Sequence, residues 1–337
     1  MAVMIDGEER RIGLALSGGG FRAAAFHLGV FSKLKELNLL DKIDVLSCVS
    51  GGSIAGAFLA ANWGQNDVLE QLDDYLSTRS IAVSSVIGGI LDPFHSRLDM
   101  LAKSYDRHLF HGRKLKELHN GPRIYLNATN LSTGNMFSFV AGDGKTTEMG
   151  EWELGFAAAG EFPISEAVAA SSAFPPVFPP LRLDADTYSK TEVDYVTLTD
   201  GGVYDNLGAN PLFRERNKVS YAIVSDAGKP FQIDDRPTES GSVVLKEAIG
   251  ILMEQVRGLQ FKRLELANLA ADEFKPLWFS IDSTEGQSQD GDSDFASSIG
   301  TNLKKLSRAE LAVLKRHGGS LLVSRLKRYG EELLSAV

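Results

Sequence analysis

Three glycine-rich turns contain residue types that together could transfer an acyl group. Ser50 follows an apolar segment, and a serine hydroxyl at the turn between a strand and a helix can attack an acyl carbon. The triple glycine at 18–20 precedes a helical segment, where backbone N–H groups facing one point could hold the resulting oxyanion. Asp200 stands before two further glycines, and its carboxylate could accept the serine proton. The three turns together predict a site for nucleophilic catalysis.

Each turn by itself has a second interpretation. A strand, a glycine turn and a helix also open a dinucleotide-binding fold, and Asp41 or Asp44 lies near the spacing of a ribose-binding acid. That fingerprint needs a third glycine, whereas Ala23 or Ala24 occupies its place. No G-x-x-x-x-G-K-[ST] motif occurs, which excludes a P-loop. The first turn therefore fits either an oxyanion hole or a nucleotide site, and Asp-Gly-Gly is also a common turn sequence.

The residues around Ser50 favour a nucleophile. The turn that exposes such a serine needs small residues two positions before and two positions after it, because strand and helix crowd there. Gly52 meets the second requirement, and Cys48, a small apolar residue within the expected strand, meets the first. A histidine base is not indicated, since only His317 follows Asp200 and its surroundings are typical of a helix C-terminus. We therefore expect a carboxylate to act as the base.

The hydrophobic pattern predicts the elements that position these turns. Apolar runs at 12–16 and 44–49 predict buried strands, and helical spacing follows each of them, at 23–37 and 53–61. This order predicts an α/β fold with a mostly parallel central sheet and helices on both faces. The other expected elements are strands at 123–129, 136–140, 195–198, 221–225 and 277–281, a helical insert at about 65–120, and helices at 163–170, at 242–272 and, as a pair, at the C-terminal end. A polar linker is expected at 282–294, and the apolar segment 81–94 could form a lid or a buried helix.

Composition limits the class of protein. The 337 residues are 43% hydrophobic and 23% charged, as in soluble globular proteins, and the net charge of −9 argues against a nucleic acid partner. A single cysteine excludes an internal disulfide, and no signal peptide or transmembrane segment is apparent, so we expect a cytoplasmic protein. Residues 301–337 contain eight Lys or Arg against three Glu. This basic end predicts either a solvated surface helix or transient contact with an anionic membrane.

With these turns in this order, the sequence resembles the patatin-like phospholipases. The resembling motifs are GGGFR at 18–22, VSGGS at 49–53, ASSAFP at 170–175, DGG at 200–202 and DNLG at 205–208. They span about residues 12–211, and the sequence departs from the family pattern at Cys48, which replaces the first glycine of the serine turn. The resemblance implies a single patatin-like domain over 1–337, with a catalytic core at about 12–213 and a C-terminal strand and helical part at about 219–337.

The resemblance also implies a role for each motif residue. Ser50 would be the nucleophile and Asp200 the proton acceptor, as a Ser–Asp dyad. Arg22 would brace the oxyanion loop or attract a phosphate headgroup. The oxyanion hole would consist of Gly18, Gly19 and Gly20. The supporting glycines would be Gly51, Gly52, Gly201 and Gly202. No metal and no cofactor is implied.

The function expected from this resemblance is that of a phospholipase A type lipid acyl hydrolase, working through an acyl-enzyme intermediate. Its partners would be a phospholipid or other acyl-ester substrate and a transient membrane surface. Two alternatives stay open: a carboxylesterase, thioesterase or acyltransferase acting on soluble acyl groups, and a membrane-lipid-degrading effector that is inactive until a partner or ligand binds. The sequence leaves the oligomeric state open.

Overall fold

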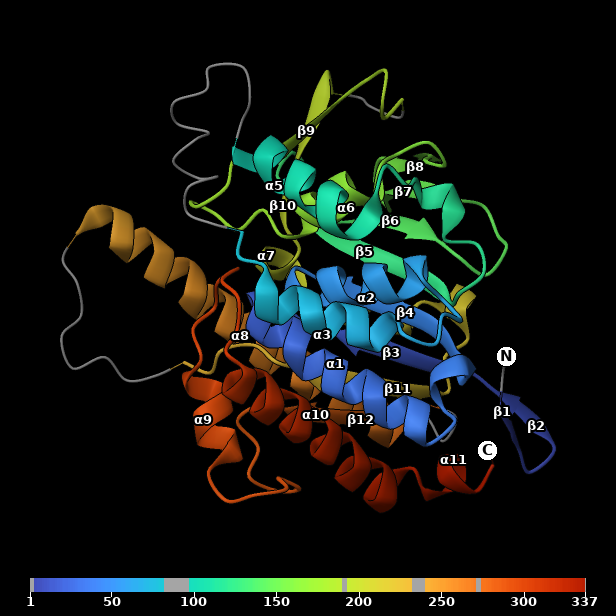
Figure 1. Cartoon of the computed structure of the whole chain (residues 1–337). Coiled ribbons are helices and arrows are strands. Elements are labelled where there is room, and N and C mark those ends of the chain that lie inside the picture. The colour runs from blue at the N-terminus through green and yellow to red at the C-terminus, as the bar shows by residue number, and fades with distance from the viewer. Residues whose placement is uncertain (1–2, 82–96, 190–192, 232–239, 271–273, 337) are drawn as a thin grey trace.

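The computed structural model describes residues 3–81, 97–189, 193–231, 240–270 and 274–336, and the following account concerns these residues. A ten-stranded sheet forms their centre (Figure 1). Five neighbouring strands are parallel, in the order β12 (Lys275–Ser280), β11 (Tyr221–Asp226), β3 (Ile12–Leu16), β4 (Ile43–Val49) and β5 (Arg123–Asn130). Beyond β5 the sheet continues with the antiparallel strands β6 (Met136–Ala141), β7 (Glu148–Glu151) and β8 (Gly155–Ala158).

The expected α/β class is confirmed, but the sheet is mixed rather than mostly parallel. Short connections link β5 to β6, β6 to β7 and β7 to β8, and short connections can join only antiparallel strands. Two further strands are antiparallel: β10 (Tyr195–Asp200) pairs with β5, and β9 (Leu181–Asp184) pairs with β10. A separate hairpin of β1 (Val3–Ile5) and β2 (Glu8–Arg10) turns at Asp6-Gly7, where both residues have positive φ.

The three middle parallel strands β3, β4 and β11 are buried on both faces, which explains their mostly apolar sequences. Leu14, Leu46 and Leu126 belong to the larger core, together with α1 (Gly20–Glu36), α2 (Gly51–Ala61), α3 (Val68–Thr78) and α10 (Arg308–Tyr329). Ala15 and Val45, each next to one of these leucines in its strand, face a second core with Leu264 of α8 (Gly241–Ala270). Figure 1 shows α1, α3 and α10 in front of the sheet and α8 behind it.

The remaining α-helices of the described chain are short. They are α5 (Arg97–Tyr105), α6 (Ile164–Ser171), α7 (Gly202–Asp205), α9 (Asp292–Ser298) and α11 (Glu331–Ser335). The linker expected at 282–294 is wrong at its end, because α9 begins at Asp292, whose carboxylate pairs with Arg316 of α10 at 2.5 Å. The expected lid or helix at 81–94 lies outside the described residues except for Ile81. Among the described helices, none is long and apolar enough to cross a membrane.

Candidate active site

The ends of β4 and β10 meet head to head along one edge of β5. In the pairing register, Val49 of β4 lies opposite Asn127, and Asp200 of β10 lies opposite the next residue, Ala128. β6 pairs with the opposite edge of β5 over this stretch, so β4 and β10 both pair with the same edge of β5, one after the other. Ser50 follows Val49 directly, so two strands of opposite direction bring Ser50 and Asp200 together.

Ser50 occupies a strained turn between β4 and α2. Its φ of 51° and ψ of −115° lie in a region that L-residues rarely adopt, and such a conformation typically costs about 1–3 kcal/mol. The glycines after it allow the tight turn, since a Cβ on Gly51 would lie 2.2 Å from the carbonyl oxygen of Gly20 and one on Gly52 would lie 2.3 Å from that of Leu16. The turn therefore holds the Ser50 side chain at the carboxyl end of the sheet, between the strand ends.

The cysteine that departs from the family pattern fits because another residue makes room for it. Cys48 is fully buried, and a Cβ placed on Gly56, in the second turn of α2, would lie 2.3 Å from its sulfur atom. The Cys48 side chain of β4 therefore occupies the space between β4 and α2 that a glycine at position 48 would leave open, and Gly56 of α2 adds no side chain there. Burial raises the pKa of the Cys48 thiol, which keeps it protonated and unreactive.

The Asp200 carboxyl is buried and faces Ser50. The Gly202 N–H donates to Oδ1 at 2.7 Å, and the Ser50 hydroxyl lies close enough to lower the pKa of the carboxyl. Burial raises the pKa of Asp200 to about 7, although both of these groups act in the opposite direction. A carboxyl group with this pKa can accept and return a proton near neutral pH.

Ser171, at the end of α6, links the two sides of the site. Its hydroxyl accepts the Ser50 N–H at 3.0 Å and donates to the carbonyl of Asn127 at 2.6 Å. Its own carbonyl accepts the N–H of Gly201 at 3.3 Å. Ser171 lies within the motif at 170–175, so the motif marked its position, but nothing in the sequence indicated that it joins the Ser50 turn to the Asp200 turn.

The glycine turn at 18–20 lies against Ser50. A Cβ on Gly18 would lie 3.2 Å from that of Ser50 and 2.4 Å from Oδ1 of Asn206. The Gly18 N–H, expected to donate to an oxyanion, instead donates to the backbone carbonyl of Asn206 at 3.1 Å in this structure. No hydrogen bond between described residues uses the N–H of Gly19 or Gly20, which have φ of 141° and 62° and open α1. These two N–H groups remain as candidate oxyanion donors.

Arg22 braces this turn from inside the protein. Its guanidinium donates to the carbonyl of Ala227 at 2.9 Å and to that of Ile299 at 2.9 Å. The side chain is fully buried, and burial lowers the pKa of Arg22 to about 10. Of the two roles expected for Arg22, this arrangement favours bracing, since a phosphate headgroup would have no access to the guanidinium.

A family model for the patatin-like phospholipases matches residues 14–213, which include every turn described above. The chain belongs to the patatin-like phospholipase family. Among curated protein sequences, none matches this patatin-like chain individually.

Solved structures with the same fold include a human cytosolic phospholipase A2 of group IVD. The patatin-like chain is 12% identical to it, with a TM-score of 0.62, covering 97% of this chain and 62% of the human one. In complex with methyl gamma-linolenyl fluorophosphonate, the human protein matches with 13% identity and a TM-score of 0.60, covering 97% and 59%. The chain thus spans about 60% of the human protein's length. At this identity the likeness concerns the fold.

The buried histidines of this patatin-like phospholipase are engaged away from the dyad. His27 in α1 contacts the carbonyl of Ser17 and the hydroxyl of Ser225, each at 3.0 Å, and burial lowers its pKa to about 4. His317 in α10 contacts the carbonyl of Ile281 at 2.8 Å. Neither ring has Ser50 or Asp200 among these partners.

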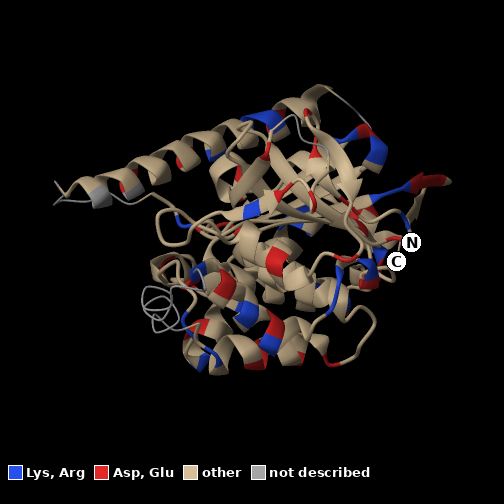
Figure 2. Ribbon diagram, turned by 90° about the horizontal axis from the view of Figure 1, so that it is seen from above, with Lys and Arg blue, Asp and Glu red and all other residues tan. Residues whose placement is uncertain are grey.

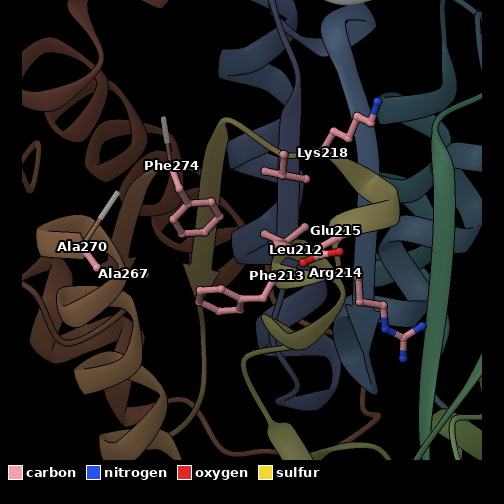
Figure 3. A pocket seen from close by; sticks show the side chains of 9 residues that line it. Leu212, Phe213, Arg214, Glu215, Lys218, Ala267, Ala270 and Phe274 are labelled. Atoms are coloured by element: carbon pink, nitrogen blue, oxygen red, sulfur yellow. The ribbon is translucent and has the colours of Figure 1, made fainter. Parts of the chain in front are cut away.

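A cavity of about 380 Å³ lies elsewhere on the patatin-like domain, between α8 and the segment at 212–219. Figure 3 shows Leu212, Phe213 and Phe274 around it, with Ala267 and Ala270 of α8 on one side. None of the residues that line this cavity belongs to the Ser50–Asp200 site. It lies on the sheet face that α8 covers, and we assign it no part in the chemistry.

Proposed function

We propose that this chain is a lipid acyl hydrolase that cleaves fatty-acyl esters of membrane phospholipids by means of a Ser50–Asp200 dyad. One observation carries the proposal: a serine in a strained strand-to-helix turn stands beside a buried carboxyl, where β4 and β10 end on β5, and burial raises the pKa of that carboxyl to about 7. A nucleophile beside a base is the minimum for acyl transfer. Membership of the patatin-like phospholipase family supports the choice of a lipid acyl substrate.

The first half of the reaction forms an acyl-enzyme. Asp200 takes the hydroxyl proton as Ser50 Oγ attacks the ester carbonyl, and the N–H groups of Gly19 and Gly20 stabilise the oxyanion. The positive end of α1 adds to this stabilisation, because the two glycines open the helix. Asp200 then gives its proton to the departing alcohol oxygen of the lysolipid, which leaves the acyl group on Ser50.

The second half returns the enzyme to its resting state. A water molecule replaces the lysolipid, Asp200 removes one of its protons, and the resulting nucleophile attacks the acyl carbon. The tetrahedral intermediate uses the same two N–H donors, and Ser50 leaves with the proton held by Asp200. Neither half needs a group beyond the protein and water. The serine turn and the Ser171 hydrogen bonds keep Ser50 in place through both halves.

The proposed setting is cytoplasmic, with transient contact to the membrane that holds the substrate. The basic C-terminal helix contributes less to this contact than its composition suggests. Arg308 and Lys315 both pair with Asp73 of α3, and Arg316 pairs with Asp292. These pairs leave few of the cations of α10 free to meet anionic lipid.

The test is the release of fatty acid from mixed phospholipid vesicles by wild type, Ser50→Ala and Ser335→Ala. Ser335 is an exposed serine at the end of α11 and serves as the matched control. We expect release by wild type and Ser335→Ala and none by a folded Ser50→Ala. Equal release by all three variants would refute the assignment of Ser50. Hydrolysis of p-nitrophenyl butyrate but not of vesicles would instead place the enzyme among the soluble-substrate esterases.

A further inference from the structure

The outer face of α8 has a leucine at every seventh residue. These leucines are Leu245, Leu252, Leu259 and Leu266, and their exposed fractions are 57%, 66%, 70% and 64%. Three positions after each one stand Ala248, Gln255, Lys262 and Leu269. We call these eight residues the leucine stripe. A leucine at every seventh residue is the spacing of one core position of a coiled coil, here sustained over nearly four heptads. The second core position, three residues on, is apolar at Ala248 and Leu269 and polar at Gln255 and Lys262.

The opposite face of α8 is already packed against the domain. Leu264 is fully buried, and Arg257 pairs with the buried Asp226 at 2.7 Å. Met253 lies beside the Asp200 turn, where a Cβ on Gly202 would approach it to 2.9 Å. Since this inner face fixes how α8 sits, the leucine stripe must point away from the body. A helix that is apolar on both faces is normally covered on both.

We propose that the leucine stripe is the interface between two copies of this chain, with the two α8 helices antiparallel. When Leu245 lies opposite the partner's Leu269, every further position of the stripe also meets a position of the partner's stripe. Ala248 then faces the partner's Leu266, Leu252 faces the partner's Lys262, and Gln255 faces the partner's Leu259. The register is the same read from either helix, as a two-fold interface requires.

Lys262 selects the antiparallel arrangement. In a parallel pair Lys262 would face the partner's Lys262, and a buried pair of like charges is unfavourable. In the antiparallel pair its aliphatic stem lies against the partner's Leu252, while its ammonium keeps the ion pair with Glu265 at 2.7 Å. Gly258 lies close to the two-fold axis in this register. It is exposed, and an added Cβ there would meet nothing within 4 Å in the single chain, so its missing side chain leaves room for the second helix.

The composition of α8 favours a second copy over a lipid surface. A helix that lies in a membrane interface carries mostly Lys and Arg on its polar face. Among the side chains of α8 that the structure describes, three acidic residues balance three basic ones. Figure 2 shows α8 as a long, sparsely charged helix that extends beyond the body. The inference is independent of the Ser50–Asp200 chemistry.

Light scattering coupled to size exclusion tests the dimer. We expect wild type to have twice the mass of one chain at micromolar concentration, and Leu252→Glu/Leu259→Glu to raise the dissociation constant at least 100-fold. Both leucines are exposed in the single chain, so the variant should fold, as circular dichroism will verify. Leu131→Glu, an exposed leucine outside α8, is the matched control and should stay dimeric. A monomeric wild type, or a double variant that remains dimeric, would overturn the proposal. So would a monomer whose vesicle binding depends on these leucines, which would assign the stripe to a membrane.

Cysteine cross-linking tests the direction of the helices. Leu245→Cys and Leu269→Cys, mixed in equal amounts and oxidised, should form a covalent dimer, because the two positions face each other. Leu245→Cys alone should not, because in the antiparallel pair its two copies lie about 36 Å apart along the helix axis. The native Cys48 is fully buried and gives no background. Cross-linking of Leu245→Cys with itself would contradict the antiparallel arrangement.

Discussion

The raised pKa of Asp200 gives hydrolysis a pH dependence that an ordinary aspartate would not give. The dyad works only while Asp200 is ionised, and burial raises its pKa from 3.8 to about 7. Activity is therefore lost as the pH falls through about 7, by tenfold for each further unit. At pH 5 about 1% of the carboxyl is ionised, against about half at pH 7, so kcat/KM should fall about 50-fold. With a pKa of 3.8 the same change in pH would lower kcat/KM by less than about 10%.

The assay is the hydrolysis of p-nitrophenyl butyrate between pH 4.5 and 9, with kcat/KM fitted to a single ionisation. A soluble ester is chosen because the charge of a vesicle surface itself changes with pH. Asp200→Asn should lower kcat/KM at every pH and abolish the inflection near 7. An inflection near 4, or one that persists in Asp200→Asn, would refute the assignment of Asp200 as the base.

The same raised pKa predicts that stability falls as the pH rises, whereas activity increases. The folded pKa of Asp200 lies above the unfolded value, so its contribution to stability is full at low pH and is lost as the pH rises towards 7. The difference of about three pKa units corresponds to about 4 kcal/mol. In urea unfolding, Asp200→Asn should therefore gain stability over wild type at pH 8 and gain little at pH 4. An equal difference at both pH values would contradict the buried-carboxyl argument.

Three further substitutions test the surroundings of the dyad. In Gly19→Ala the alanine must adopt a φ of 141°, which displaces a candidate oxyanion donor. The kcat on vesicles should therefore fall about 100- to 1,000-fold with little change in KM. An unchanged kcat would exclude the Gly19 N–H as an oxyanion donor. Ser171→Ala leaves the Ser50 N–H without its acceptor and should lower the acylation rate constant about tenfold, measured from the burst phase; a raised KM with an unchanged acylation rate would argue against a positioning role. Gly56→Ala should reduce the free energy of urea unfolding by about 1–3 kcal/mol through its clash with Cys48. Adding Cys48→Gly should recover most of that loss, and no recovery would contradict the contact.

The local pattern of the sequence predicted the elements in which the site lies. The apolar runs before 17 and 50 are buried strands, and the helices after them begin at Gly20 and Gly51. The sequence does not predict the strands β1, β2, β7, β8 and β9, because each has only three or four residues and most are partly exposed. Short strands of this kind lack the alternating pattern that single-sequence reasoning detects.

The contacts between distant segments could not be predicted. The sequence predicted Asp200 at the end of a strand. It did not predict that this strand pairs with the edge of β5 next to the end of β4, since register depends on tertiary pairing. The same holds for Gly18, whose N–H is used by Asn206, and for Arg22, whose acceptors lie more than 200 residues away. Motif spacing indicates which residues belong to a site, and the backbone hydrogen bonds decide what each is free to do.

The most direct test of the account is covalent labelling with an alkyl fluorophosphonate, read by peptide mass spectrometry at neutral pH and at pH 5. Such a reagent attaches only to an activated serine, so we expect one phosphonylated residue, Ser50, with labelling that slows at pH 5 and nearly ceases in Asp200→Asn. Labelling of a different serine, or of Ser50 at an undiminished rate without the Asp200 carboxylate, would contradict the Ser50–Asp200 dyad.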